Sequence, residues 1–350
     1  MLIALPSYEV GQCLESIDDF FYEKGWSDGL PIVPPTEDRV VAMVSASGRD
    51  STDLIGVLPV TNHRLDVASL AVNAVMAGCR PEHFRALIAT MEALMQNQVN
   101  IAAVQATTHP AAPLAIFSGA VVRELEMNDG SGVFGPGNRA LAVIGRAVRL
   151  VLVCVGGGVP GRGDQATHGH PGKYTYAIAE SSRTMGWSPL HERIDGNHRR
   201  SAVSVIACEA PRNVNDHGSM DARGILGTIA GTLSSLGFNN IHRGGPITVI
   251  LGPEHAEICR IGGHDPSTIS EELFDRARVS LSLVSEENLR RFQRVRPDRF
   301  SGLSSRDCVP VTTSASDIIV AVAGGAGRHS MVLPSFGISE PAVQTIREPL

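Results

Sequence analysis

The sequence predicts an α/β protein with mixed sheets and helices, two subdomains and a helical N-terminal third. Runs of β-branched and apolar residues at 203–207, 247–252 and 317–323 are typical of buried strands. Amphipathic helical patterns lie between such runs, and one of them, over 84–95, has a single continuous apolar face. Strands that alternate with helices of this kind are characteristic of α/β folds.

The length of 350 residues favours about two domains. The glycine-rich stretch 156–164 is the most linker-like segment of the chain and therefore the best candidate for a boundary. We expect an N-terminal helical and α/β subdomain over 1–155 and a C-terminal α/β subdomain over 165–350.

The N-terminal part is expected to place helices around a short strand at 54–58. The proline-rich stretch 26–35 must be extended, because proline restricts its own backbone and that of the preceding residue. Residues 101–110 are expected to form a strand that ends at a polar tip, and a second strand should follow at 113–118. Helices are predicted over 13–25, 36–47, 66–78, 81–95 and 139–152.

The second half is expected to begin with a strand that ends at Ala179. A strand over 203–211, a polar loop over 212–219 and a helix over 220–237 should follow, with Ser219 as the N-cap of the helix. Helices are predicted from Pro253, near 267–278 and near 285–294, and 296–316 should be irregular. The tail from Pro334 is expected to lie on the surface.

Composition limits the classes of function. Hydrophobic residues make up 43% of the chain and charged residues 19%, as in soluble globular proteins. The formal net charge of −6 argues against nucleic acid as a partner. The most apolar run, 140–155, is interrupted by Arg146 and Arg149, so no membrane span is expected. The six cysteines are scattered without a CxxC motif, which indicates reduced thiols and a cytoplasmic location.

The loop 212–219 is the first candidate site. It would present His217, the hydroxyl of Ser219 and free backbone N–H groups at a helix N-terminus, where anions bind. The alternative is an ordinary capped turn. The segment after 317–323 has a similar design, because glycines precede His329 and Ser330 and would expose N–H groups to an anion. The glycines concerned are Gly324, Gly325 and Gly327.

A second glycine-rich loop precedes the helix over 139–152. It could hold a carboxylate or phosphate with Gly135, Gly137, Asn138 and the forked donor Arg139. The alternative is a flexible turn, with the arginines of the helix facing solvent or another subunit. His109 is expected at a strand end, where α/β proteins often bind ligands, although a structural hydrogen bond is the alternative.

Lys173 is conspicuous, because it and Lys24 are the only lysines. It follows His168 and His170, which could share a metal ion in an extended segment but lack a third ligand at a fixed spacing. We therefore expect Lys173 to supply charge or a proton. Cys208 and Glu209 with Lys173 are the residue types of a Cys-Glu-Lys amide or nitrile hydrolase, but their spacing differs, and Cys208 could simply be buried.

Several motifs together resemble an uncharacterised bacterial family associated with UGSC-motif thiol or selenol proteins. They are DGLP with VPPT at 28–36, AGCRPE at 77–82, VQATTHP at 104–110, FGPGNR at 134–139, NDHGS at 215–219 and GGAGRHS at 324–330. The resemblance covers nearly the whole chain. It implies a UGSC-type thiol or selenol protein as a neighbour or partner but carries no established catalytic residues. This chain has no UGSC-type motif of its own.

These patterns favour a cytoplasmic homo-oligomeric enzyme that acts on a small polar or anionic substrate by acid–base chemistry of the hydrolase or lyase type. The sequence indicates no particular cofactor. The alternatives are a metal-dependent enzyme with histidine ligands and a non-catalytic partner of a thiol or selenol redox protein. The expected catalytic residues are His109, Lys173, His217, Ser219, His329 and Ser330, and we expect the histidines to meet around one cavity.

Overall fold

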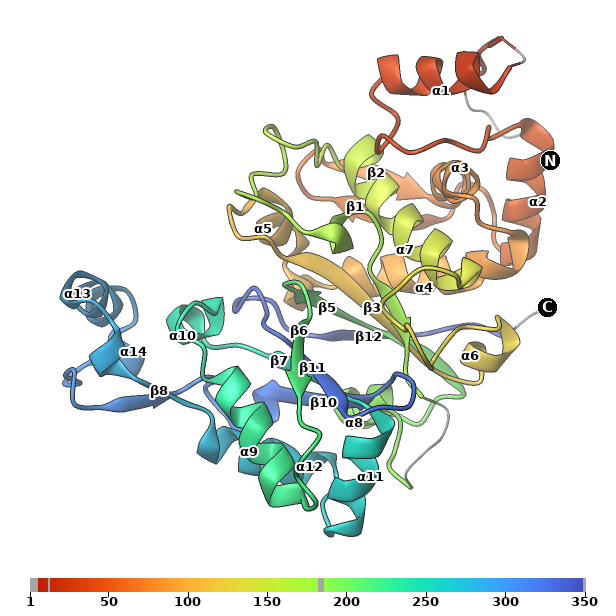
Figure 1. Cartoon of the computed structure of the whole chain (residues 1–350). Coiled ribbons are helices and arrows are strands. Elements are labelled where there is room, and N and C mark those ends of the chain that lie inside the picture. Colours follow the sequence, from red (N-terminus) through yellow and green to blue (C-terminus); the bar gives the residue numbers. More distant parts are fainter. Residues whose placement is uncertain (1–5, 12, 182–185, 349–350) are drawn as a thin grey trace.

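The computed structural model describes residues 6–11, 13–181 and 186–348. Two four-stranded sheets lie face to face, and helices cover the outer side of each, so the main body has four layers (Figure 1). The predicted α/β class, with mixed sheets and a helix-rich N-terminal part, is confirmed.

The first sheet has the strand order β12-β5-β3-β4. It contains β3 (Ala112–Gly119), β4 (Ala177–Ala179), β5 (Ser201–Cys208) and β12 (Ala342–Thr345). β3 is parallel to β4 and antiparallel to β5, and every residue of β5 is buried. β3 comes from the first expected subdomain, and the other three strands of this sheet come from the second. The division of the chain near 155–165 stays a prediction.

The second sheet has the strand order β10-β7-β11-β6. It contains β6 (Arg212–Asn215), β7 (Ile247–Leu251), β10 (Ile318–Val322) and β11 (His329–Leu333). β10 and β7 are parallel, whereas β11 is antiparallel to both β7 and β6. The expected loop 212–219 is therefore partly a strand. Its polar residues fit an edge strand, where three of the four residues of β6 are exposed.

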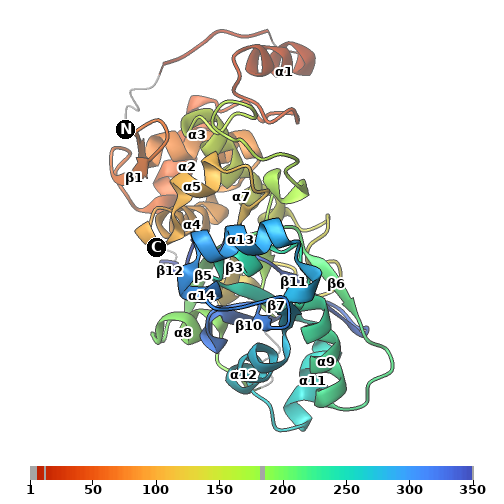
Figure 2. The same ribbon diagram turned by 90° about the vertical axis from the view of Figure 1, so that its left-hand side faces the viewer.

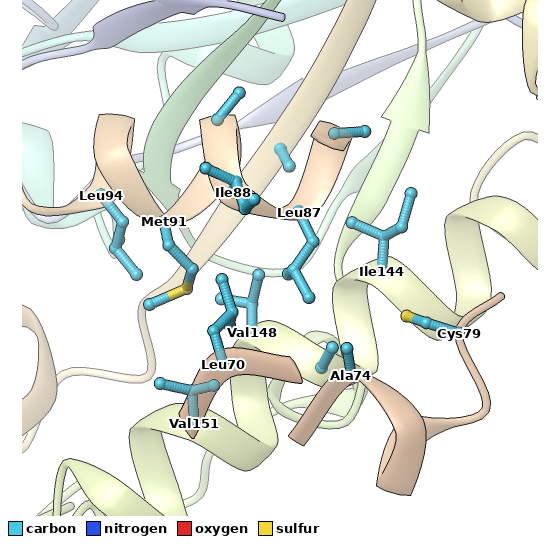
Figure 3. Packing of buried hydrophobic residues seen from close by; sticks show 14 of the residues in the cluster. Leu70, Ala74, Cys79, Leu87, Ile88, Met91, Leu94, Ile144, Val148 and Val151 are labelled. Carbon is cyan, nitrogen blue, oxygen red and sulfur yellow. The ribbon is translucent and has the colours of Figure 1, made fainter. Parts of the chain in front are cut away.

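Side chains along each strand point alternately to the two faces of its sheet, and the apolar ones form three cores. One set of side chains, including Leu114, Ile206, Ile250 and Leu333, fills the space between the sheets. The opposite faces pack against helices. The first sheet is covered by α4 (Phe84–Leu94) and α7 (Arg139–Leu150), on which α3 (Val67–Ala77) packs from outside. The second sheet is covered by α9 (Ala222–Leu233), α11 (Pro253–Ile261) and α12 (Pro266–Arg276). Figure 3 shows Leu70 of α3, Met91 of α4 and Val148 of α7 in one such core.

The N-terminal segment adds α1 (Leu14–Glu23), α2 (Glu37–Ser47) and a hairpin of β1 (Leu54–Leu58) and β2 (His63–Asp66). α1 stands apart from the main body in both views (Figures 1 and 2). The remaining short elements are η1 (Pro81–His83), η2 (Asn97–Val99), α5 (Ile101–Ala106), α6 (Val121–Glu124), η3 (Val151–Val155), η4 (Pro171–Lys173), α8 (Leu190–Asp195), α10 (Asn239–Arg243), β8 (Arg278–Ser280), η5 (Leu281–Leu283), α13 (Glu286–Val295), α14 (Pro297–Phe300), β9 (Cys308–Pro310) and η6 (Ala315–Asp317).

Three local predictions are wrong. Residues 101–106 form the helix α5, because Ile101, Val104 and Gln105 are buried at helical spacing. The tail beyond Pro334 enters the first sheet as β12, where Ala342 is buried against the core. Short elements, including β9, interrupt the stretch 296–316, which was expected to be irregular.

The helix expected over 220–237 is shorter than predicted. Asp221, not Ser219, caps α9, because its carboxylate accepts the N–H of Gly224 at 2.9 Å. Ser219 approaches the same helix from the side, and a Cβ at Gly224 would lie 2.5 Å from its Oγ. Glycine at that position therefore permits the close approach of the loop.

All six cysteines are free thiols, and four of them are shielded at least in part from solvent. Among the described residues, no helix is both long enough and apolar enough to cross a bilayer.

Asn138 caps α7, so its replacement by alanine should lower stability. Its Oδ1 accepts the N–H of Leu141 at 3.1 Å, and its Nδ2 donates to the carbonyl of Glu126 at 2.7 Å. We expect Asn138→Ala to lower the free energy of unfolding by about 1–2 kcal/mol in urea titrations. Asn215→Ala, at an exposed edge-strand position, is the control and should change it by less than about 0.5 kcal/mol. Equal effects of the two substitutions would contradict the assigned cap.

Candidate functional site

The register of the first sheet brings His109 and Glu209 together. Ala112 at the start of β3 pairs with Cys208 at the end of β5, so the residues just before β3 lie beside those just after β5. His109 Nε2 is 2.8 Å from Glu209 Oε1, although the two residues are 100 positions apart. The ring of His109 also stacks on Phe336 with a centroid separation of 5.8 Å.

The contact with Glu209 assigns the tautomer of His109. A carboxylate accepts hydrogen bonds, so Nε2 must carry the proton, and Nδ1 of the neutral ring keeps its lone pair. Nδ1 is buried and makes no hydrogen bond with the described residues. A buried polar atom without a partner costs about 1–3 kcal/mol, so such an atom calls for an explanation. One explanation is that this nitrogen accepts a proton or a hydrogen bond from a ligand.

Lys173 lies in a compact group of buried charges. Its Nζ is 2.6 Å from Asp164 Oδ2, and Arg149 Nη2 is 3.6 Å from the same oxygen. Arg149 Nε also donates to the backbone carbonyl of Lys173 at 3.0 Å. The side chains of Asp164 and Arg149 are only 7% exposed and that of Lys173 is 14% exposed. Two cations therefore share one carboxylate with little access to water.

Burial lowers the pKa of Lys173, and the hydrogen bond and charge of Asp164 oppose this fall only in part. Burial also lowers the pKa of Arg149, again against Asp164. Desolvation disfavours a charged amine, so Lys173 can release a proton more readily than a surface lysine.

His170 and Tyr176 join these charges to His109. His170 Nδ1 accepts the N–H of Gly172 at 3.1 Å, so the ring proton lies on Nε2, which makes no hydrogen bond of normal geometry. Burial lowers the pKa of His170, although the nearby backbone of Cys208 opposes the fall. Tyr176 donates to the carbonyl of Glu209 at 2.7 Å, and its ring lies edge-on to His170.

The segment 164–176 is fastened directly to the His109 segment. Both the backbone N–H and the hydroxyl of Thr167 donate to the carbonyl of Thr108. The fields of Lys173, Arg149 and Glu209 all act on His170. We define the Lys173 cluster as His109, Arg149, Asp164, His170, Lys173, Tyr176 and Glu209.

Cys208 and Glu209 lie in the same region as Lys173, as a Cys-Glu-Lys hydrolase would require, but the thiol is unsuited to attack. Cys208 is fully buried in the core between the sheets. Burial raises its pKa to about 12, and its sulfur lies 3.9 Å from Thr248 Oγ1. A nucleophilic cysteine needs the opposite shift.

The second sheet brings His217 and His329 together at a different place. His329 starts β11 and pairs with Asn215 of β6, and His217 follows two residues later. The two Nε2 atoms are 3.2 Å apart, and His329 Nδ1 is 3.1 Å from Asn213 Oδ1. Both histidines are exposed. This pair was expected from the sequence to meet.

Ser219 and Ser330 have hydroxyls that are already engaged. Ser219 donates to Asp216 Oδ2 at 2.8 Å, and Thr228 donates to the same oxygen at 2.6 Å. Ser330 lies 2.8 Å from His255 Nδ1. The other nitrogen of His255 donates to the carbonyl of Asp216, so Nδ1 accepts the Ser330 hydroxyl. This Ser–His pair is 3% and 0% exposed, which suits a structural contact.

The structure does not bring His109 to the His217–His329 pair. His329 begins β11, whereas Ser335, just beyond its other end, bridges to Cys208 beside Glu209. Six residues of extended chain span roughly 20 Å. The expectation of one cavity for all three histidines is therefore wrong, because His109 and His329 lie at opposite ends of β11.

The glycine-rich loops meet each other, and several of their N–H groups are bonded internally. Gly324 donates to the carbonyl of Asp129 at 2.9 Å, and a Cβ at Gly325 would collide with Ser131. Gly327 donates to Glu254 Oε1 at 2.7 Å, and Gly135 to the carbonyl of Gly132 at 2.6 Å. These four were expected to bind substrate. Of the others in that set, Gly137 is exposed in a left-handed conformation, Asn138 caps α7, and Arg139 is exposed and acts electrostatically on His83.

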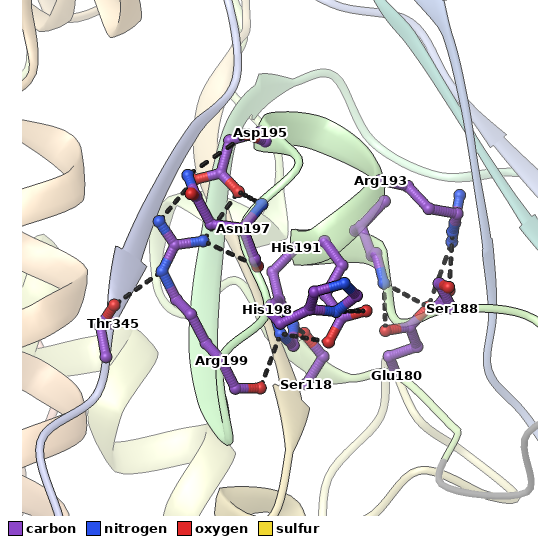
Figure 4. Close-up of polar contacts among 12 residues, drawn as sticks. Ser118, Glu180, Ser188, His191, Arg193, Asp195, Asn197, His198, Arg199 and Thr345 are labelled. Carbon is purple, nitrogen blue, oxygen red and sulfur yellow. Dashed lines mark hydrogen bonds and ion pairs between the residues drawn. The ribbon is translucent and has the colours of Figure 1, made fainter.

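A further polar group at the edge of the first sheet was not predicted (Figure 4). Ser118 Oγ lies 2.6 Å from His191 Nδ1, and both residues are buried. Glu180 accepts the N–H of Leu190 at 2.8 Å and contacts Arg193 at 3.3 Å. Burial raises the pKa of Glu180 despite the nearby Arg193. These contacts anchor α8 to the sheet.

Sequence reasoning missed Arg149 and Asp164 as site residues. Arg149 was visible as a charge that interrupts the most apolar run of the chain, and Asp164 as an acid beside a glycine-rich stretch. Tyr176 carried no comparable signal. In residues 6–11, 13–181 and 186–348 no three His, Cys, Asp or Glu side chains are placed to hold an ion, so the structure adds no third ligand to His168 and His170.

The buried charges of Asp164, Lys173 and Arg149 predict which of two substitutions lowers the free energy of unfolding more. Asp164→Asn would leave two buried cations without a carboxylate, so we expect it to lower the free energy of unfolding by roughly 3–5 kcal/mol. Lys173→Met keeps the Arg149–Asp164 contact and should cost clearly less. Urea unfolding followed by circular dichroism measures both. A larger loss of unfolding free energy in Lys173→Met than in Asp164→Asn would contradict the conclusion that Lys173 and Arg149 share Asp164.

Asp216 predicts a pH-dependent stability. Desolvation acts to raise its pKa, but hydrogen bonds from Thr228, Ser219 and Gly218 outweigh it and lower the pKa to about 2. The ionised carboxylate therefore stabilises the fold at neutral pH, and this contribution disappears as the pH falls from about 4 toward about 2.

We expect Asp216→Asn to lower the free energy of unfolding by roughly 1–2 kcal/mol at pH 7, after allowance for solvent screening, and by less at pH 3.5. Unfolding in urea at several pH values measures the difference. Asp19→Asn, at an exposed position on α1, is the control. A difference that did not depend on pH would refute the role of the charge.

Comparisons with known proteins give no information about the function of this chain. No family model matches the chain, and no curated protein or solved structure matches it either. Any functional conclusion must therefore rest on the residues of the site itself.

Proposed function

We propose that the Lys173 cluster is the active site of an enzyme that binds a small anionic substrate and moves a proton through His109. The reaction would be of the hydrolase or lyase type. The observation that carries the proposal is the hydrogen bonding of the His109 ring. Its Nε2 contacts Glu209, while its Nδ1 is buried and has no hydrogen-bond partner among the described residues. A carboxylate that orients an imidazole in this way is a recurrent device for a general base.

The charges next to Lys173 favour an anion. Arg149 and Lys173 carry two positive charges against the one carboxylate of Asp164. The ammonium group of Lys173 has three N–H donors, of which Asp164 uses one, so two can serve a carboxylate or phosphate. Arg149 is too buried to meet a substrate, but it adds positive potential and fixes the backbone of Lys173.

The proton step follows from the unpartnered ring nitrogen of His109. Nδ1 of His109 would accept a proton from water or from an activated carbon of the substrate, and Glu209 would stabilise the imidazolium that forms. Nε2–H of His170 is a hydrogen-bond donor in the same region and lies near the backbone of Cys208. Burial lowers the pKa of His170, so this ring stays neutral and can donate at neutral pH. Both hydrolysis and elimination can begin with such a transfer.

Solvent can reach the edge of the cluster. The side chains of His109 and Glu209 are 15% and 22% exposed, similar to Lys173, whereas Asp164 lies deeper. A homo-oligomeric state, a cytoplasmic location and a UGSC-type thiol or selenol partner are part of the same proposal and rest on the sequence alone.

A ligand screen tests the proposal. Small carboxylates and phosphates would be tested by thermal shift and by ligand-detected NMR, and each binder would then be incubated with the protein and followed by NMR for conversion. We expect Lys173→Met to weaken binding at least tenfold, because it removes the less buried of the two cations. His109→Gln should retain binding and lower the rate of conversion by about 10²–10⁴-fold. His63→Gln, at an exposed position on β2, is the control and should match the wild type.

The pH dependence of conversion gives an independent check. If the anion requires charged Lys173, the rate should fall in alkali at a lower pH than an ordinary lysine would give, because burial lowers the pKa of Lys173. Lys173→Arg should move this fall to higher pH, since arginine stays charged. Unchanged conversion in His109→Gln, or unchanged binding in Lys173→Met, would exclude the Lys173 cluster as the active site.

A further inference from the structure

We propose that His217 and His329 form a binding site for a divalent transition-metal ion of the zinc or copper type. The site lies at the opposite end of β11 from the Lys173 cluster and does not depend on the function proposed for that cluster. Its ligands would be the two Nε2 atoms, which come from the loop after β6 and from the first residue of β11.

The separation of the two nitrogens fits a shared ion. Histidine nitrogens lie about 2.0–2.1 Å from zinc in tetrahedral sites, which places two of them about 3.3 Å apart. The two Nε2 atoms are 3.2 Å apart, and the rings meet nearly at right angles, with an interplanar angle of 79°. An ion could therefore bind both nitrogens once each ring turns so that its Nε2 lone pair points to the ion.

The ring of His329 has the tautomer that a metal ligand needs. Its Nδ1 is 3.1 Å from Asn213 Oδ1, and a carbonyl oxygen accepts, so Nδ1 carries the proton and Nε2 keeps its lone pair. A second group that orients a ligating histidine in this way is a regular feature of metal sites. Without an ion, Nε2–H of His217 donates to the lone pair of His329. Metal binding would replace this hydrogen bond, because His217 would then carry its proton on Nδ1 and use the lone pair of Nε2 for the ion.

The loops that carry the two rings are fixed to each other. Arg328, next to His329, donates to the carbonyls of His217 and Ser219 at 3.0 and 2.9 Å. The carboxylate of Asp216, next to His217, is saturated by hydrogen bonds from its own loop and from Thr228. Arg328 and Asp216 therefore fix the backbone of the two loops beside the histidines. The loops need little reorganisation when an ion binds.

The donor set indicates the class of ion. Two imidazoles and no carboxylate favour zinc, copper or nickel over magnesium or calcium, which prefer oxygen. The positive charge of Arg328 is partly balanced by Glu254, whose carboxylate is 3.7 Å away. In the part of the chain that the structure describes, no third His, Cys, Asp or Glu side chain completes the group. Both rings are exposed, so the remaining positions would be open to water or to a small ligand.

The experiment uses the untagged full chain, because an affinity tag of histidines would bind the same ions. Cys13 and Cys308 are exposed thiols that could also bind zinc, so both are replaced by serine in every sample. Zinc chloride and copper chloride are titrated separately by calorimetry in a buffer that does not chelate metals. We expect one ion per chain with a dissociation constant in the micromolar range for at least one of the two metals.

The variants His217→Gln and His329→Gln should each weaken binding at least tenfold, because a single imidazole remains. Asn213→Ala should weaken it by a few-fold, since the tautomer of His329 is no longer held. His63→Gln and His168→Gln, at two other exposed histidines, are the matched controls and should bind as the parent does. Circular dichroism establishes that each variant is folded.

NMR signals of the histidine rings provide a second readout. In the parent, the ion should shift the ring resonances that are lost in His217→Gln and in His329→Gln. Binding that survives the double substitution, binding equally reduced in the controls, or the absence of binding in the parent would each overturn the proposal.

Discussion

The packing of the two sheets against each other is the constraint on which the rest of the structure depends. Leu114, Ile206, Ile250 and Leu333 project into the space between the sheets, and their neighbours along each strand project into the helical layers. Burying a side chain of this size contributes about 1.5–3 kcal/mol. This packing, with the bridge between Cys208 and Ser335, joins the end of β11 to the end of β5. The Lys173 cluster lies beside that junction.

The polar groups near the core divide into two kinds. Asp216, Ser219, Ser330 and His255 satisfy one another, so their hydrogen bonds are better explained by loop structure than by chemistry. The Lys173 cluster differs, because the buried Nδ1 of His109 makes no hydrogen bond with the described residues. Two of its cations, Lys173 and Arg149, share the carboxylate of Asp164, while its other carboxylate, Glu209, contacts His109. Unsatisfied groups of this kind are costly to fold, and active sites are a common place to find them.

The separation of His109 from the His217–His329 pair shows that polar residues near strand ends do not always meet at one edge of a sheet. Polar tips after strands do gather at the same edge when the strands are parallel and adjacent. Here β11 runs antiparallel to β7, and the segment that holds His109 follows a helix, not a strand. A histidine at the start of β11 and a histidine before β3 are therefore placed at different ends of the molecule's central layers.

The sequence by itself determined the fold class, the main strands and most helices, because alternating and helical patterns of apolar residues report which face of an element is buried. It also identified His109, Lys173, His217 and His329 as unusual, since each stands beside glycine, proline or a strand boundary. It could not place α5 or β12, because short apolar runs fit a helix, a strand or a surface segment equally well.

Only the tertiary structure decided which of these residues meet. The contacts of His109 with Glu209, of Lys173 with Asp164 and Arg149, and of His217 with His329 depend on strand register and sheet packing. Register is a long-range property: residues 100 positions apart are matched by pairing between β3 and β5, and no local pattern records that match.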